Sequence, residues 1–275
     1  MSIKEYHLYR AKFIKPAQLS LLSPDMSTAD IFHGAILGKP SIVSKGGAEW
    51  HIGNIVNSSP LTGSFAVGRS TKKVIEKYDR TTGDFIDQLG DAAPYTKVIF
   101  DCEIGLLGIA KKTSLAPDAH SVATKIQNLF KKSIVVQECG VDVVVSFIRD
   151  PQDFLVKLNS AYSIKRFKAT FTGPNPIDAD ELFQKPLSVY CQKMHAEHGC
   201  LDVYGSAIDP EVATAITKST AATGNTASAK IQLEKDSKIT NIALKGIPAI
   251  AQINDDLGLE EQVSQMKEEY RRIRL

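Results

Sequence analysis

The chain has few cysteines and aromatic residues and no long apolar run. It holds one tryptophan and four cysteines in 275 residues, and the cysteines show no C-x-x-C spacing. Reduced thiols are therefore expected rather than a disulfide framework. No run approaches the roughly 18 apolar residues of a membrane-spanning helix, and the residues after Met1 lack the apolar centre of a signal peptide. We expect a cytoplasmic protein.

The common motifs of nucleotide binding and hydrolysis are also missing. The sequence contains no G-x-x-x-x-G-K-[ST], no G-x-G-x-x-G and no G-x-S-x-G. We therefore predict no catalytic residue and no cofactor, and an enzyme is the less favoured class.

Positive charge is concentrated in the first half of the chain. The net charge is only +2, but residues 1–133 hold 17 Lys+Arg against 12 Asp+Glu. A pI of 8.2 is too mild to indicate a nucleic-acid-binding protein by itself, so such a function requires clustering of the cations. The basic groups are Arg10/Lys12, Arg69–Arg80, Lys111/Lys112, Lys131/Lys132 and Lys165/Arg166/Lys168.

Each basic group alone is more typical of a solvated surface, but their number favours one continuous stripe. Aromatic residues near them are sparse, which favours contact with the backbone of duplex DNA over stacking on unpaired bases. The predicted nucleic-acid-binding residues are Arg69, Lys72, Lys73, Lys77, Arg80, Lys111, Lys112, Arg166 and Lys168.

The pattern of apolar residues and turns predicts an α+β protein with two domains. Residues 1–133 read as a basic, mostly antiparallel α+β domain, and residues 134–275 as a sheet with helices packed against it. Strands are expected at 6–14, 50–56, 64–69, 97–100, 106–110, 134–136, 141–148, 163–172, 201–206, 228–234 and 239–245. Helices are expected at 28–36, 117–132, 150–162, 179–198, 210–222 and 259–274, with a polar segment at 79–93 and a turn at 173–176.

Two metal hypotheses remain open beside this one. Cys191, His195, His198 and Cys200 are zinc-type ligands, but their spacing matches no common zinc module, and a buried cysteine beside exposed histidines is the commoner explanation. Asp101, Glu103 and Lys111 faintly resemble the D…E-x-K spacing of metal-dependent nucleases. Acids in a solvated turn are the commoner explanation, so no metal ligand is predicted.

A protein-interaction adaptor is a third class. Leu259, Val263 and Met266 form an apolar stripe near the C-terminus, which would be its surface. Such a stripe is more often packed on its own domain.

The order of elements resembles a known family. Residues 64–80, the hairpin at 97–110, the strand at 141–145, the helix after Pro151 and the turn Pro174-Asn175-Pro176 are similar to the phage lambda exclusion protein RexA and related phage-defence proteins. The resemblance covers about residues 50–200.

The resemblance implies a two-domain homodimer that binds DNA without sequence preference and acts in abortive infection. A membrane protein is sometimes its partner. The family has no catalytic motif to carry over. We therefore expect a DNA-binding protein of phage defence, with a metal-dependent nuclease toxin or an adaptor as alternatives; preference for DNA or RNA stays open.

Overall fold

The computed structural model is a mixture of helices and antiparallel strands. It describes residues 2–15, 26–172, 181, 183–196, 198–246 and 248–274, apart from the side chains of Lys73 and Gln192. Within these residues the elements are β1 (Ile3–Ile14), α1 (Thr28–Leu37), β2 (Ser41–Val43), β3 (Glu49–Ser59), β4 (Thr62–Asp79), β5 (Asp84–Ala92), β6 (Tyr95–Asp101), β7 (Leu106–Ala110), α2 (Ala119–Lys132), α3 (Ile134–Glu138), β8 (Asp142–Phe147), α4 (Gln152–Asn159), β9 (Ser163–Thr172), α5 (Gln184–Lys193), β10 (His198–Tyr204), α6 (Pro210–Ala222), β11 (Ala227–Gln232), β12 (Thr240–Ala243), β13 (Ile250–Asn254) and α7 (Leu259–Arg274).

The large sheet is organised around β1. Its strands follow the order β13-β1-β7-β6-β4-β3-β2, and β8 also pairs with β1. One edge of β1 is shared, because residues 3–7 pair with β13 and residues 9–14 pair with β8. The other edge pairs with β7. Most of β1 is therefore buried, as its run of apolar and aromatic residues predicts.

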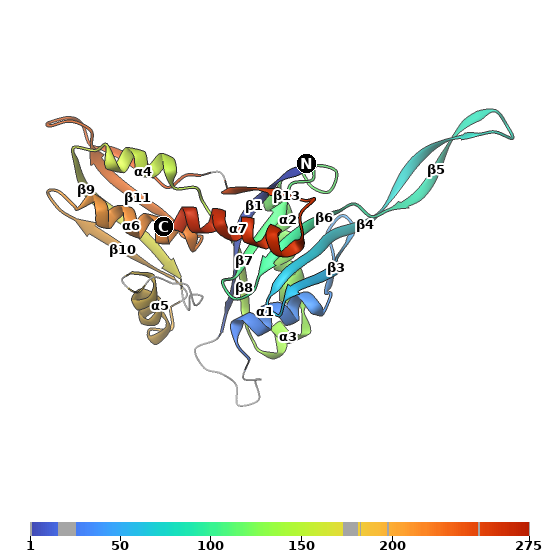
Figure 1. Cartoon of the computed structure of the whole chain (residues 1–275), viewed down its shortest axis with the longest axis horizontal. Coiled ribbons are helices and arrows are strands. Elements are labelled where there is room, and N and C mark those ends of the chain that lie inside the picture. Colours follow the sequence, from blue (N-terminus) through green and yellow to red (C-terminus); the bar gives the residue numbers. More distant parts are fainter. Residues whose placement is uncertain are drawn as a thin grey trace.

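The second sheet is inserted between two neighbouring strands of the large one. The chain leaves β8, forms α4, α5, α6 and a sheet of order β10-β9-β11-β12, and returns as β13. Backbone bonds join the two crossings: Leu8 N donates to Ala249 O, Ile148 N to Leu8 O, and Ala249 N to Ile148 O. The second sheet lies at one end of the molecule (Figure 1).

One face of the large sheet is covered by α1, α2 and α3. Asp118 caps α2 by accepting from the N–H of Ser121, and apolar side chains at helical spacing face the sheet. Phe13 stacks on Phe32 with ring centroids 4.9 Å apart, and Phe130 meets Phe32 edge-on at 5.4 Å. Aromatic rings from a strand and two helices thus form the first core.

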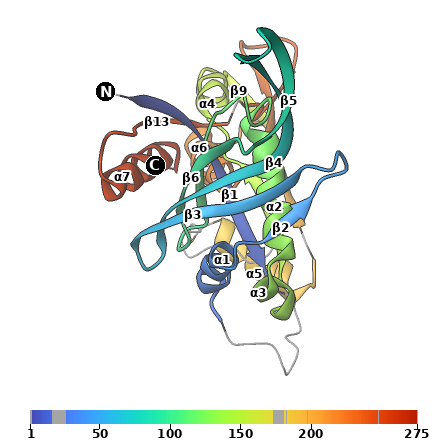
Figure 2. The ribbon, with the colours of Figure 1, turned by 90° about the vertical axis from the view of Figure 1, so that its right-hand side faces the viewer.

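The opposite face is covered by α7, and its core continues into the second sheet. Figure 2 shows α7 and α2 on opposite sides of the strands. Met266 of α7 belongs to the same buried cluster as Leu8 of β1 and Phe167 of β9. Val263 and Met266 of the predicted adaptor stripe are buried, and Leu259 packs against this core, so the stripe holds α7 to its own chain.

The division of the chain at residue 133 stays a prediction. The strands β8 and β13 lie after that boundary in sequence, yet both pair with β1. The core that contains α7 also joins the two sheets.

Several predicted elements differ from the structure. Residues 134–136 form the start of helix α3 rather than a strand, and the polar segment 79–93 contains β5. The predicted helix at 179–198 is the shorter α5, and β10 already begins at His198. Strands β2 and β13 were not predicted. The turn predicted at 173–176 lies outside the described residues.

A two-stranded arm projects from the large sheet at the end opposite the second sheet (Figure 1). It consists of residues 71–92, where the end of β4 pairs with β5, and its turn contains Gly83 at φ 75°. None of its described side chains belongs to either core. Its exposed large apolar side chains are Val74, Ile75, Tyr78, Phe85, Ile86 and Leu89.

Candidate nucleic-acid interface

The second sheet has one buried and one open face. Along β9, Phe167, Ala169 and Phe171 are buried on the side of α5 and α6, whereas Lys168 is exposed and Arg166 is half-buried. Successive side chains of a strand point to opposite faces, so the two cations lie on the open face. The sequence pattern predicted this alternation.

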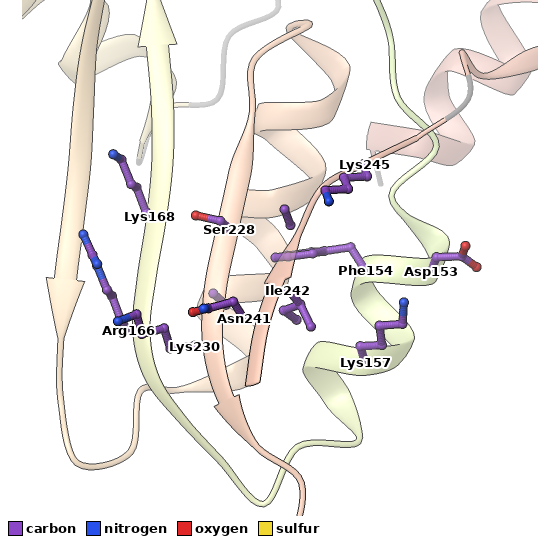
Figure 3. A pocket seen from close by; sticks show the side chains of 12 residues that line it. Asp153, Phe154, Lys157, Arg166, Lys168, Ser228, Lys230, Asn241, Ile242 and Lys245 are labelled. Atoms are coloured by element: carbon purple, nitrogen blue, oxygen red, sulfur yellow. The ribbon is translucent and has the colours of Figure 1, made fainter. Parts of the chain in front are cut away.

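Strand register brings further polar groups beside these cations. Lys230 of β11 lies opposite Arg166, and Ser228 lies opposite Lys168. Asn241 of β12 lies opposite Lys230. Paired residues of an antiparallel sheet share a face, so all five side chains line the same surface. Figure 3 shows them over the three neighbouring strands.

Helix α4 and the segment after β12 turn this surface into a pocket of about 630 Å³, which we call the sheet pocket. Lys157 comes from α4 and Lys245 follows β12 (Figure 3). The lining contains one carboxylate, that of Asp153. The cations of the sheet pocket are Lys157, Arg166, Lys168, Lys230 and Lys245. A concave surface with this excess of positive charge attracts anions.

Arg166 is anchored by a neighbouring strand. Its Nε donates to Asp202 Oδ1 at 2.8 Å, a second N–H donates to Oδ2, and its guanidinium lies 4.9 Å from the centre of the Tyr204 ring. This bond raises the pKa of Arg166 and lowers the pKa of Asp202. It also offsets the repulsion between Arg166 and the facing Lys230.

The four lysines of the sheet pocket lack such a partner. Within the described part of the chain, no carboxylate forms an ion pair with Lys157, Lys168, Lys230 or Lys245. Asp202 of β10 lies opposite Lys168 and offsets part of its charge, whereas the charge of the other three lysines is directed to solvent and to any anion bound there.

The densest group of predicted cations lies on the arm instead. Lys72, Lys77 and Arg80 are exposed there, and Lys73 lies on the same strand with its side chain outside the described part. Residues 71–92 also hold Glu76, Asp79, Asp84, Asp87 and Asp91, so four cations face five carboxylates. Lys72 is directly opposite Asp91. The arm is thus a mixed surface with a slight excess of negative charge.

The remaining predicted residues lie on the large sheet. Arg69 lines a hollow of about 200 Å³ at the base of the arm. Lys111 and Lys112 follow β7, and Lys112 Nζ lies 4.9 Å from the centre of the Tyr95 ring. Of the predicted residues, Arg166 and Lys168 are the two in the sheet pocket. The arm and the second sheet lie at opposite ends of the molecule (Figure 1), so the predicted cations do not form one stripe.

Two other basic groups serve the fold. Arg10 and Lys12 are buried, with Arg10 Nη1 donating to Tyr270 at 2.7 Å and Lys12 Nζ donating to Thr172 Oγ1 at 2.6 Å. Burial lowers the pKa of Lys12 to about 7. Lys131 forms a 2.8 Å ion pair with Asp142.

The residues of the nuclease hypothesis do not form a cluster. Asp101 is fully buried, accepts the backbone N–H groups of Glu103 and Ile104, and forms a 2.7 Å ion pair with Lys267. Glu103 and Lys111 are exposed. Asp101 therefore supports a turn and anchors α7.

The zinc hypothesis finds no converging ligands in the described residues. Cys191 is buried, whereas His195, His198 and Cys200 are exposed. Across the described ranges, no group of three or more His, Cys, Asp and Glu side chains is placed to hold a metal ion.

Sequence reasoning missed Lys157, Lys230 and Lys245, which are single lysines in separate elements. The sequence did contain a signal for Lys230: apolar residues alternate along 227–232, and Ala227, Ala229 and Ile231 are buried, which leaves Lys230 on the open face. Their convergence depends on strand order, which the sequence pattern did not indicate.

Searches of protein-family models and curated proteins find no match to this chain. The resemblance to the RexA-like family stays a prediction. No helix in the described part of the chain is both long enough and apolar enough to cross a membrane.

Proposed function

We propose that the protein binds nucleic acid without sequence preference, by holding backbone phosphates on the open face of the second sheet. The observation that carries this proposal is the sheet pocket, where five cations converge against two carboxylates, Asp153 in the lining and Asp202 bound to Arg166. Lysine and arginine bind phosphates through charge and N–H donors, and such contacts carry no sequence information.

The geometry favours this surface over the arm. On the arm, cations alternate with carboxylates, so the field that a phosphate meets is weak. In the sheet pocket, Lys168 and Lys230 stand on neighbouring strands, and Arg166 is held in place by Asp202. The phosphate-binding groups are thus partly preorganised before the ligand arrives.

A salt titration tests the proposal. If the four unpaired lysines each contact one phosphate, log Kd should change with log salt concentration with a slope of about 3 to 4. Fluorescence anisotropy with labelled DNA oligonucleotides at several salt concentrations measures it. Affinity that does not depend on salt would refute the proposal.

Matched variants locate the surface. The triple variant Lys168→Gln/Lys230→Gln/Lys245→Gln should lower affinity at least tenfold and flatten the salt slope. The control Lys72→Gln/Lys77→Gln/Arg80→Gln removes as many cations from the arm and should leave both unchanged. The opposite result would move the interface to the arm.

On the resemblance alone, we further propose a homodimer that binds DNA in phage defence in the cytoplasm and has a membrane protein as a partner. Size-exclusion chromatography with light scattering tests the homodimer. Plaque counts on cells with and without the protein test the role in defence, for which equal counts would be the refuting result.

The arm supports a second candidate function, that of a protein-interaction adaptor. An isolated two-stranded hairpin is marginally stable in water, and this one exposes apolar side chains along both strands, with Phe85 exposed at 83%. An adaptor would retain its partner after the lysines of the sheet pocket are changed and lose it after Phe85→Ser/Leu89→Ser.

A further inference from the structure

The sheet pocket is a concave site rather than a flat basic surface. Its volume of about 630 Å³ lies within the range of sites that enclose a small ligand. The bases of a double helix are paired and stacked inside it, and they reach such a pocket only after unstacking and unpairing. An unpaired nucleotide enters without that cost.

The lining of the sheet pocket contains groups that suit a base as well as groups that suit phosphate. Ala243 of β12 is exposed and supplies apolar surface beside the cations. Phe154 of α4 and Ile242 also line the pocket (Figure 3), but Phe154 is 3% exposed and both pack in the core behind the open face. Asn241 also stands on β12, directly opposite Lys230, and its amide can both donate and accept hydrogen bonds. Apolar contact with a base together with hydrogen bonds to its edge is the way that unpaired bases are recognised.

The cations lie where the phosphates of a bound nucleic-acid strand would be. Arg166 and Lys168 line the β9 side of the sheet pocket, and Lys157 lines its α4 side (Figure 3). A nucleotide bound between these two sides would have cations near its own phosphate and near the phosphate of the next nucleotide. This arrangement suits a nucleotide that is part of a longer nucleic-acid strand.

We propose that the sheet pocket holds one unpaired nucleotide, so that the protein prefers single-stranded nucleic acid to duplex. This inference rests on the proposed function and narrows its ligand. It departs from the expectation of duplex DNA, which rested on the few aromatic residues near the predicted cations. The groups that suit a base, Asn241 and Ala243, come from β12, which is remote in sequence from Arg166 and Lys168.

The test compares a labelled single-stranded 12-mer with the duplex of the same sequence at equal salt concentration. We expect the single strand to bind at least tenfold more tightly. Equal or tighter binding of the duplex would overturn the inference and leave the proposed function intact. Failure of both probes to bind would refute the proposed function itself.

Filling the sheet pocket tests where the preference arises. Ala243 is exposed on β12 and lines the sheet pocket, so Ala243→Trp should occupy the space of a base while keeping every lysine. The preference for single strand should then fall to within twofold of unity, with little change for duplex. Ala207→Trp, at an exposed position outside the lining, is the matched control. A preference that survives Ala243→Trp would overturn the inference.

The amide gives an independent measurement. Asn241→Ala should weaken binding of the single strand three- to tenfold without changing the salt slope, because it removes hydrogen bonds and no charge. Lys230→Gln should instead lower the slope. An equal loss for single strand and duplex in Asn241→Ala would contradict base contact.

Discussion

At the residue scale, buried charges in this chain hold elements together. Asp101 ends β6, accepts two backbone N–H groups and pairs with Lys267 of α7. Its side chain is fully buried, whereas that of Lys267 is 28% exposed. The stability of a fold that buries a carboxylate depends strongly on the ion-pair partner of that carboxylate.

We expect Asp101→Asn to lower the free energy of unfolding by about 2 kcal/mol, because it replaces charge-assisted hydrogen bonds by neutral ones and leaves the partly exposed Lys267 without its partner. The amide oxygen of asparagine can still accept the backbone N–H groups of Glu103 and Ile104, so the loss of stability reports mainly the ion pair with Lys267. Urea unfolding followed by circular dichroism measures it. Glu103→Gln, an exposed carboxyl two residues away, is the control and should change stability by less than about 0.5 kcal/mol. Equal effects of the two variants would contradict the assignment.

Lys12 predicts a pH dependence of stability. Burial, with a smaller effect of Arg10, lowers its pKa from 10.5 to about 7. Below about pH 7 both the folded and the unfolded state bind the proton, whereas between about pH 7 and 10.5 the unfolded state alone retains it. The contribution of Lys12 to stability therefore rises with pH across this window.

The variant Lys12→Met isolates that contribution, because the other titrating groups are shared with the wild type. Between pH 7 and 9, the wild type should gain about 2 kcal/mol of unfolding free energy relative to Lys12→Met. Urea titrations at the two pH values measure the difference. A constant difference would show that Lys12 is not a buried neutral amine at pH 9.

Residue-level patterns in the sequence had a limited range. Alternation along β9 correctly placed Arg166 and Lys168 on one face, because period two is a local property. The same reasoning treated Arg10 and Lys12 as surface cations, yet both are buried. β1 pairs on both edges, and nothing within its own residues indicates that the second sheet covers it there.

At the element scale, the helices with capping residues were predicted well and the short strands poorly. Asp118 and the spacing of apolar residues locate α2. An apolar run such as 134–136 fits a strand or a helix turn equally, and the structure makes it part of α3. β5 was missed because Asp87, Gln88, Gly90 and Asp91 are poor strand formers. Residues 84–92 are a strand because they pair with β4.

Removal of the arm should leave the fold intact. Replacing residues 73–90 by Asn-Gly connects the strands with a two-residue turn and removes no residue of either core. We expect the melting temperature to change by less than about 3 °C, which corresponds to roughly 1 kcal/mol. Differential scanning fluorimetry measures it.

The same arm deletion separates the two candidate functions. If the sheet pocket binds nucleic acid, the affinity of the deletion variant should equal that of the wild type, measured by anisotropy at one salt concentration. A tenfold loss with an unchanged melting temperature would place the interface on the arm.

At the scale of the whole molecule, the insertion of the second sheet decides where the candidate site lies. Because residues 149–249 leave the large sheet after β8 and return before β13, the sheet pocket is built at one end while the arm projects from the other (Figure 1). The predicted division at residue 133 follows a change in charge and strand pattern. Pairing between strands that are distant in sequence depends on which of their faces are buried together, and a local sequence pattern does not predict this.

This topology predicts that residues 1–133 do not fold alone. The fragment contains β1 but lacks β8 and β13, which pair with one of its edges, and α7, whose Met266 covers Gly108. Leu8 and Leu106 are fully buried in the whole chain, and exposing them in the fragment would cost about 1.5 to 3 kcal/mol of folding free energy each. The purified fragment should show poor dispersion of amide signals in NMR and no cooperative urea transition, whereas the full chain should show both. A cooperatively folding fragment would instead support two domains divided at residue 133, because one edge of β1 would then be stable without its partners.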